Sequence, residues 1–124
     1  TPLHTASARG HLDVARLLIE KGADFSATTN RGLTPVHLCA FRGTEAMLRL
    51  LIEHGGDISS GANGGRTPLH LAAFAGREAF VHLLIQEGVD LSPRTKSGVT
   101  PLHDAARHES YGREAVVRLL VAKG

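Results

Sequence analysis

Cysteine is nearly absent from this sequence of 124 residues, in which Cys39 stands alone. A single thiol excludes an internal disulfide framework and any zinc cluster built from cysteines. The chain also lacks a run of about 18 consecutive apolar residues, and no charged segment followed by an apolar block opens it, so neither a membrane span nor a signal peptide is indicated. We therefore expect a soluble intracellular protein, in the cytoplasm or the nucleus.

A strong excess of charge of one sign is missing as well. Lys and Arg number 14 and Asp and Glu number 12, which leaves a formal net charge of +2. This balance does not by itself indicate a nucleic-acid partner, so the placement of the charges matters more than their sum. The composition, with 42% hydrophobic and 21% charged residues, is that of a globular chain, and the length predicts a single domain over residues 1–124.

Glycine and proline are plentiful and recur at a fixed interval. Four copies of a Thr-Pro-apolar-His segment begin at Thr1, Thr34, Thr67 and Thr100, each 33 residues after the previous one. A period in this range indicates a solenoid or propeller made of similar small units. We divide the chain into units 1–33, 34–66, 67–99 and 100–124, of which the last carries three extra residues before its second helix.

The content of one unit predicts two helices and a turn. Thr before Pro starts a helix, because the hydroxyl caps a free backbone N–H and proline at the first position has no N–H to lose. The histidine three residues after that threonine lies within reach of it, and a glycine ends this helix after about two turns. A longer amphipathic helix with apolar Val14, Leu17 and Leu18 follows and ends at Gly22. Residues 30–32 then read as the tight turn of an extended hairpin.

These features resemble the ankyrin repeat family. The resemblance rests on the 33-residue period, the TPLH-x-A start, the glycine between the helices and the Leu-Leu pair before Gly22, and it covers the whole chain. It implies an all-α solenoid of stacked helix-turn-helix repeats with short projecting β-hairpins. Family repeats usually carry Asp at the base of the hairpin, where this chain has Thr29, Ala62 and Thr95, so the side-chain bond of that turn is in question, above all at Ala62.

The two ends of the array do not have the sequence expected of terminal units. The first unit begins directly at a helix cap, and the last unit carries Val116, Val117, Leu119, Leu120 and Val121. Solenoids need terminal units with a polar outer face. We therefore interpret the chain as a piece of a longer array or protein.

Residue types that carry chemistry occur without the patterns that chemistry needs. Equivalent histidines of stacked units lie about 8–10 Å apart, whereas zinc holds its nitrogen ligands at about 2.0–2.1 Å, so these rings are expected to be structural. In the insertion of the fourth unit, His108, Glu109 and Ser110 are neighbours in sequence, but adjacency does not make a catalytic triad. We expect no enzyme, no cofactor and no metal.

The predicted binding surface consists of the short-helix faces that point away from the second helices, together with the loop tips. In ankyrin repeats these elements line a concave groove that grips other proteins, and the resemblance implies the same surface here. It holds six basic residues against one acidic residue, Asp104, and two phenylalanines that are either exposed in the groove or buried between units. The predicted partner-binding residues are Arg9, Arg31, Leu33, Phe41, Arg42, Arg66, Phe74, Lys96, Arg107 and His108.

This surface predicts non-catalytic recognition of another protein by a monomer. The partner would present an acidic segment with an apolar anchor, since Arg and aromatic side chains at the centre of a patch form binding hot spots. Two alternatives stay open. A nucleic acid or polyphosphate would use the same arginines, and its affinity would fall steeply with salt. In the other alternative, the array is an architectural spacer whose groove touches only its own parent protein.

Overall fold

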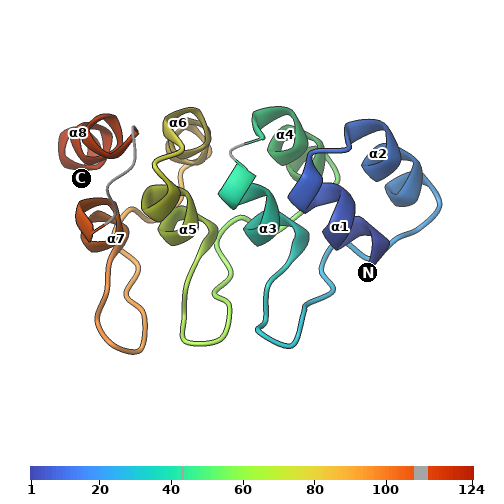
Figure 1. The fold of residues 1–124 in the computed structure, drawn as a ribbon, viewed down its shortest axis with the longest axis horizontal. Coiled ribbons are helices and arrows are strands. Elements are labelled where there is room, and N and C mark those ends of the chain that lie inside the picture. The colour runs from blue at the N-terminus through green and yellow to red at the C-terminus, as the bar shows by residue number, and fades with distance from the viewer. Residues whose placement is uncertain (43, 108–111) are drawn as a thin grey trace.

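A computed structural model describes residues 1–42, 44–107 and 112–124 of the chain. These ranges contain eight helices and no strand, and the helices form four pairs placed side by side (Figure 1). The prediction of an all-helical solenoid of stacked helix-turn-helix units is confirmed. Within these ranges the helices are α1 (Pro2–Arg9), α2 (Leu12–Glu20), α3 (Pro35–Arg42), α4 (Glu45–Glu53), α5 (Pro68–Ala75), α6 (Glu78–Gln86), α7 (Pro101–Arg107) and α8 (Arg113–Lys123).

The helices form two rows. The first helices of the pairs, α1, α3, α5 and α7, pack against one another in order, and the second helices, α2, α4, α6 and α8, do the same. The long loops project together beyond the row of first helices (Figure 1). The insertion of the fourth unit falls at residues 108–111, which lie outside the described ranges, so the prediction for His108 stays a prediction.

Each first helix begins at a Thr–His pair, and in the first three units this pair also connects the helix to the start of the next unit. The Thr67 backbone N–H donates to Nδ1 of His70 at 3.1 Å, and the Thr67 hydroxyl caps the helix. The His70 Nε2 lies 2.8 Å from the carbonyl oxygen of Val99, directly before the next unit. A carbonyl only accepts, so Nε2 carries the proton. Nδ1 accepts from the Thr67 N–H and therefore has no proton, so the ring is neutral. The same bond joins His4 to the carbonyl of Leu33 and His37 to that of Arg66.

The second helices supply most of the large core residues. Met47, Leu50 and Phe80 are buried where inner units have neighbours on both sides. Their first-unit equivalents include Val14 and Leu17, which are 50% and 55% exposed. The predicted apolar face of the second helix is therefore covered in the inner units and partly uncovered in the first, where Leu18 is half-buried.

The predicted β-hairpins are not formed as strands in the described residues. In the first loop, the Thr29 N–H donates to the Leu33 carbonyl at 2.9 Å and the Gly32 N–H donates to the Thr29 carbonyl at 2.8 Å. These bonds close a tight turn, but they are too few for a ladder of paired strands. The expectation of a β-hairpin was wrong in this respect, and the loops are extended turns.

The base of each loop is held as its residue type allows. The hydroxyl oxygens of Thr29 and Thr95 accept from backbone N–H groups four residues later, at 3.2 and 3.0 Å. Ala62 has no such oxygen, and that loop is closed by the backbone bond from the Ala62 N–H to the Arg66 carbonyl at 2.7 Å. The side-chain bond placed in question at the three positions is thus made at Thr29 and Thr95 and is missing at Ala62.

Candidate functional site

The loop tips are bonded to one another and form a continuous edge. The Asn63 N–H donates to the Arg31 carbonyl at 2.9 Å, and the Lys96 N–H donates to the Gly64 carbonyl at 2.8 Å. A Cβ on Gly32 would lie 2.7 Å from the Asn63 side-chain oxygen and 2.9 Å from the Asn63 backbone nitrogen. Glycine at this position therefore permits the close approach that aligns the tips.

A pocket of about 340 Å³ opens between this edge and the helices α3 and α5. Its floor is apolar, since Leu71 is buried and Leu33 and Phe74 are half-buried. Phe41 borders the pocket and is 42% exposed. A volume near the lower end of the range for ligand sites, about 300–1,000 Å³, suits a single large side chain. We call this site the loop pocket, and its lining residues are Arg31, Leu33, Phe41, Ala62, Asn63, Arg66, Leu71 and Phe74.

Most of the cations predicted for this surface are exposed. Five of these cations form no ion pair within the described residues. Their charges are therefore available to a partner. These five exposed cations are Arg9, Arg31, Arg42, Lys96 and Arg107.

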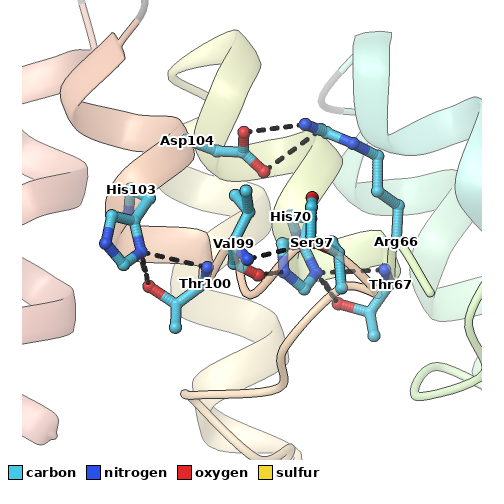
Figure 2. Close-up of polar contacts among 9 residues, drawn as sticks. Arg66, Thr67, His70, Ser97, Val99, Thr100, His103 and Asp104 are labelled. Atoms are coloured by element: carbon cyan, nitrogen blue, oxygen red, sulfur yellow. Dashed lines mark hydrogen bonds and ion pairs between the residues drawn. The ribbon is translucent and has the colours of Figure 1, made fainter. Parts of the chain in front are cut away.

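Arg66 differs from the other cations because its charge is compensated. Its Nη1 and Nη2 donate to the two Asp104 carboxylate oxygens at 3.1 and 3.0 Å, a two-point pair drawn in Figure 2. The Asp104 side chain is 0% exposed, whereas the Arg66 side chain is 35% exposed and covers it. The one acid of the predicted groove is thus buried beneath one of its arginines.

The structure brings half of the predicted residues together. Arg31, Leu33, Phe41, Arg66 and Phe74 line the loop pocket. The remaining described cations, Arg9, Arg42, Lys96 and Arg107, do not line it. The lining is completed by three residues that were not among the predicted binding residues, Ala62, Asn63 and Leu71. The repeat register could have indicated them, because it places them on the same loop and helix faces as the predicted residues.

Arg77 is a further residue that motif analysis missed. Its Nε donates to the Phe41 carbonyl at 2.8 Å and so connects the start of α6 to the last turn of α3. This bond supports the backbone that carries Phe41. No repeat motif signals it, because the contact is between a side chain and a backbone oxygen 36 residues earlier.

A larger hollow of about 580 Å³ lies between α6 and α8 on the row of second helices. Its wall includes the carboxylates of Glu78 and Glu114, and its cation, Arg118, already pairs with Glu114. No aromatic residue lines it. The loop pocket differs from this hollow in its apolar lining, its two phenylalanines and the exposed Arg31.

Cys39, His37 and His70 are buried groups within the repeat core. Burial raises the pKa of the Cys39 thiol above its ordinary value, so the thiol stays protonated. Burial likewise lowers the pKa of His37 and of His70, which agrees with the neutral rings inferred from their hydrogen bonds. In the described ranges, no three His, Cys, Asp or Glu side chains gather to hold a metal, and no helix has the length and hydropathy to cross a membrane.

The stacked helix pairs and aligned loops define a helical repeat solenoid. Two family models match the chain: ankyrin repeats in many copies over residues 3–52, and ankyrin repeats in three copies over residues 57–124. The chain belongs to the ankyrin repeat family. Ankyrin repeats are generally protein–protein interaction modules and are typically non-enzymatic.

One curated relative is similar over a short segment. It is the probable E3 ubiquitin-protein ligase XBOS33 of Oryza sativa subsp. japonica, 53% identical over 34 residues. The match covers 27% of this chain and 6% of that protein, so it spans little more than one repeat.

Proposed function

We propose that this chain is a non-catalytic recognition module that binds an acidic segment of another protein. An apolar or aromatic side chain of that segment enters the loop pocket, and flanking carboxylates meet the exposed cations. The observation that carries the proposal is the combination in one pocket of an apolar floor, a Phe41 ring left 42% exposed, and Arg31 at the rim.

The two parts of the surface have different roles. Covering Phe41 and the pocket floor removes apolar area from water, at about 25 cal/mol per Å² before the costs of association are subtracted. The exposed cations attract an acidic segment and exclude basic ones, which sets the association rate and the choice of partner. Both parts are needed, because charge alone gives little affinity at physiological salt.

A selection from random short peptides displayed on phage tests the proposal. The immobilised 124-residue chain should enrich peptides that combine Asp or Glu with one Phe, Leu, Trp or Ile. Enrichment of basic peptides, or no enrichment above bare resin, would contradict the proposal.

Matched variants locate the binding to the loop pocket. Phe41→Ala and Arg31→Glu should each weaken a selected peptide about tenfold or more, as hot-spot residues do. Leu17→Ala and Arg16→Glu serve as controls, since both residues are exposed and lie on α2 outside the pocket. An equal loss in variant and control would place the binding elsewhere.

The salt dependence separates a peptide from a nucleic acid or polyphosphate. A polyanion held by the five exposed cations would lose affinity along a steep line of log affinity against log salt. A peptide anchored on Phe41 should weaken modestly over the same range. A steep line together with insensitivity to Phe41→Ala would favour the polyanion.

A further inference from the structure

The Arg66–Asp104 pair consists of two departures from the repeat pattern that meet in space. At the position of Arg66 the neighbouring units have Leu33 and Val99, and at the position of Asp104 the preceding unit has Leu71. Position 66 and position 104 are in direct contact, as two hydrogen bonds show. Two opposite charges are therefore in contact at positions where the adjacent units have apolar residues.

The stacking of the repeats has a second support that does not involve these charges. The His37 ring holds this stretch of chain through the backbone carbonyl of Arg66, at 3.0 Å, and any side chain leaves that carbonyl in place. A buried ion pair also gives no assured gain in stability, because desolvation of the two groups offsets their attraction. The effect of the pair is instead electrostatic, and it falls on the loop pocket that Arg66 lines.

The loop pocket consequently has one available arginine and one neutralised arginine. Arg31, from the loop after α2, is exposed and has no ion pair within the described residues, whereas Arg66, from the loop after α4, is held by Asp104. An incoming carboxylate near Arg66 would have to compete with a buried carboxylate that already makes both bonds. Like charges placed together are unfavourable, and such repulsion is a means of specificity.

We infer that Asp104 determines specificity by keeping partner carboxylates away from Arg66, so that the acidic residues of a bound segment lie on the Arg31 side of its anchor. The inference rests on the proposed function and deepens it. It makes the loop pocket directional: a segment with carboxylates on one flank of the anchor binds, and a segment with them on the other flank binds more weakly.

Two synthetic peptides of equal composition test the direction. Each has acetylated and amidated ends and one central phenylalanine, flanked by two glutamates on one side and two glutamines on the other, and the second peptide has the flanks exchanged. By fluorescence anisotropy, the 124-residue chain should bind one of them about fivefold or more tightly than the other, the scale of a partly desolvated charge contact. Added salt should reduce the difference.

The variant Asp104→Leu releases Arg66 and installs the side chain that the preceding unit has at this position. The difference between the two peptides should shrink to about twofold or less, because the disfavoured peptide gains a cation. The double variant Arg66→Leu/Asp104→Leu is the control. It lacks both charges and should keep the original preference. A purely structural role for Asp104 would change the two affinities equally and leave their ratio unmoved.

The outcomes separate the inference from the function beneath it. Equal binding of both peptides to the unmodified chain, or a ratio that survives Asp104→Leu, overturns the directional inference and leaves the proposed function standing. Binding of neither peptide by any variant contradicts both. If Asp104→Leu fails to give a cooperative unfolding transition, Asp104→Asn replaces it, since the amide keeps the shape and removes the charge.

Discussion

Two equivalent positions along the groove are built from opposite kinds of side chain. In the first, Leu33 and Leu71 form part of the apolar floor of the loop pocket, and in the next, Arg66 and Asp104 form a two-point ion pair. The backbone is the same in both, since a histidine ring holds the loop carbonyl in each case. The histidine bonds that hold the loops are therefore independent of the side chains that the loops display. The ion pair occupies positions that are apolar in the preceding unit, and both of its charged residues are present together.

Removal of the Arg66 cation alone should cause the largest loss of stability among these variants. Arg66→Leu leaves the Asp104 carboxylate buried without its counter-charge, and loss of one partner of a buried pair costs about 3–5 kcal/mol. Urea denaturation followed by circular dichroism measures this as a lower free energy of unfolding. A loss below about 1 kcal/mol would mean that Asp104 finds water or another donor, contrary to its full burial.

Replacement of both charged residues by leucine should restore the free energy of unfolding that the single variant Arg66→Leu loses. Arg66→Leu/Asp104→Leu recreates the apolar residues of the preceding unit, and exchanges of this kind leave a protein unchanged or stabilise it by about 1–4 kcal/mol. The same denaturation curves test it against the single variant. A double variant as unstable as Arg66→Leu would show that leucine does not fit this site.

The buried Ser7 hydroxyl is a polar group without a partner in the described residues, so its removal should stabilise the protein. The Ser7 hydroxyl is buried and has no hydrogen-bond partner within the described residues, where the next two units have buried Ala40 and Ala73. Ser7→Ala should raise the free energy of unfolding by about 1 kcal/mol, because an unsatisfied buried group is removed. The reverse change, Ala73→Ser, should lower it by a similar amount, and a gain in stability from both would contradict this account.

The smallest effect concerns pH and the histidine support common to both positions. Burial lowers the pKa of His37 and His70 below the ordinary 6.5 of the unfolded chain. Between the folded and unfolded pKa values, the unfolded state binds more protons, so the free energy of unfolding falls as the pH drops below about 6.5 and is constant above it. The Arg66→Leu/Asp104→Leu variant should keep this dependence, since burial is the largest cause of the His70 shift.

Denaturation midpoints measured across the pH range from neutral to mildly acidic follow this effect. His37→Gln should flatten the curve, because it removes one of the two rings whose pKa is lowered by burial. A midpoint that rises on acidification would contradict neutral rings in the caps.

Much of the fold was predictable because it repeats. The threonine, proline and histidine of each helix start, the glycine stops and the 33-residue period are local signals, and four copies reinforced them. The missing side-chain bond at Ala62 followed from residue type alone. The absence of paired strands in the loops did not, since it depends on how few backbone bonds each turn makes.

The site was predictable in outline and not in its pairing. Register placed Arg31, Phe41 and Phe74 on one face, and they line one pocket. The contact of Arg66 with Asp104 joins residues 38 positions apart, and no periodicity predicts which side chains meet across units. The usable signal was that leucine or valine stands at both positions in neighbouring units.

The histidine bonds to Leu33, Arg66 and Val99 are made to carbonyl oxygens, which every amino acid possesses. These hydrogen bonds between units therefore do not depend on which side chain the accepting residue carries. The histidine bonds therefore persist when these side chains are exchanged, whereas Arg66 has to change together with Asp104, because its side chain is bound to a buried carboxylate.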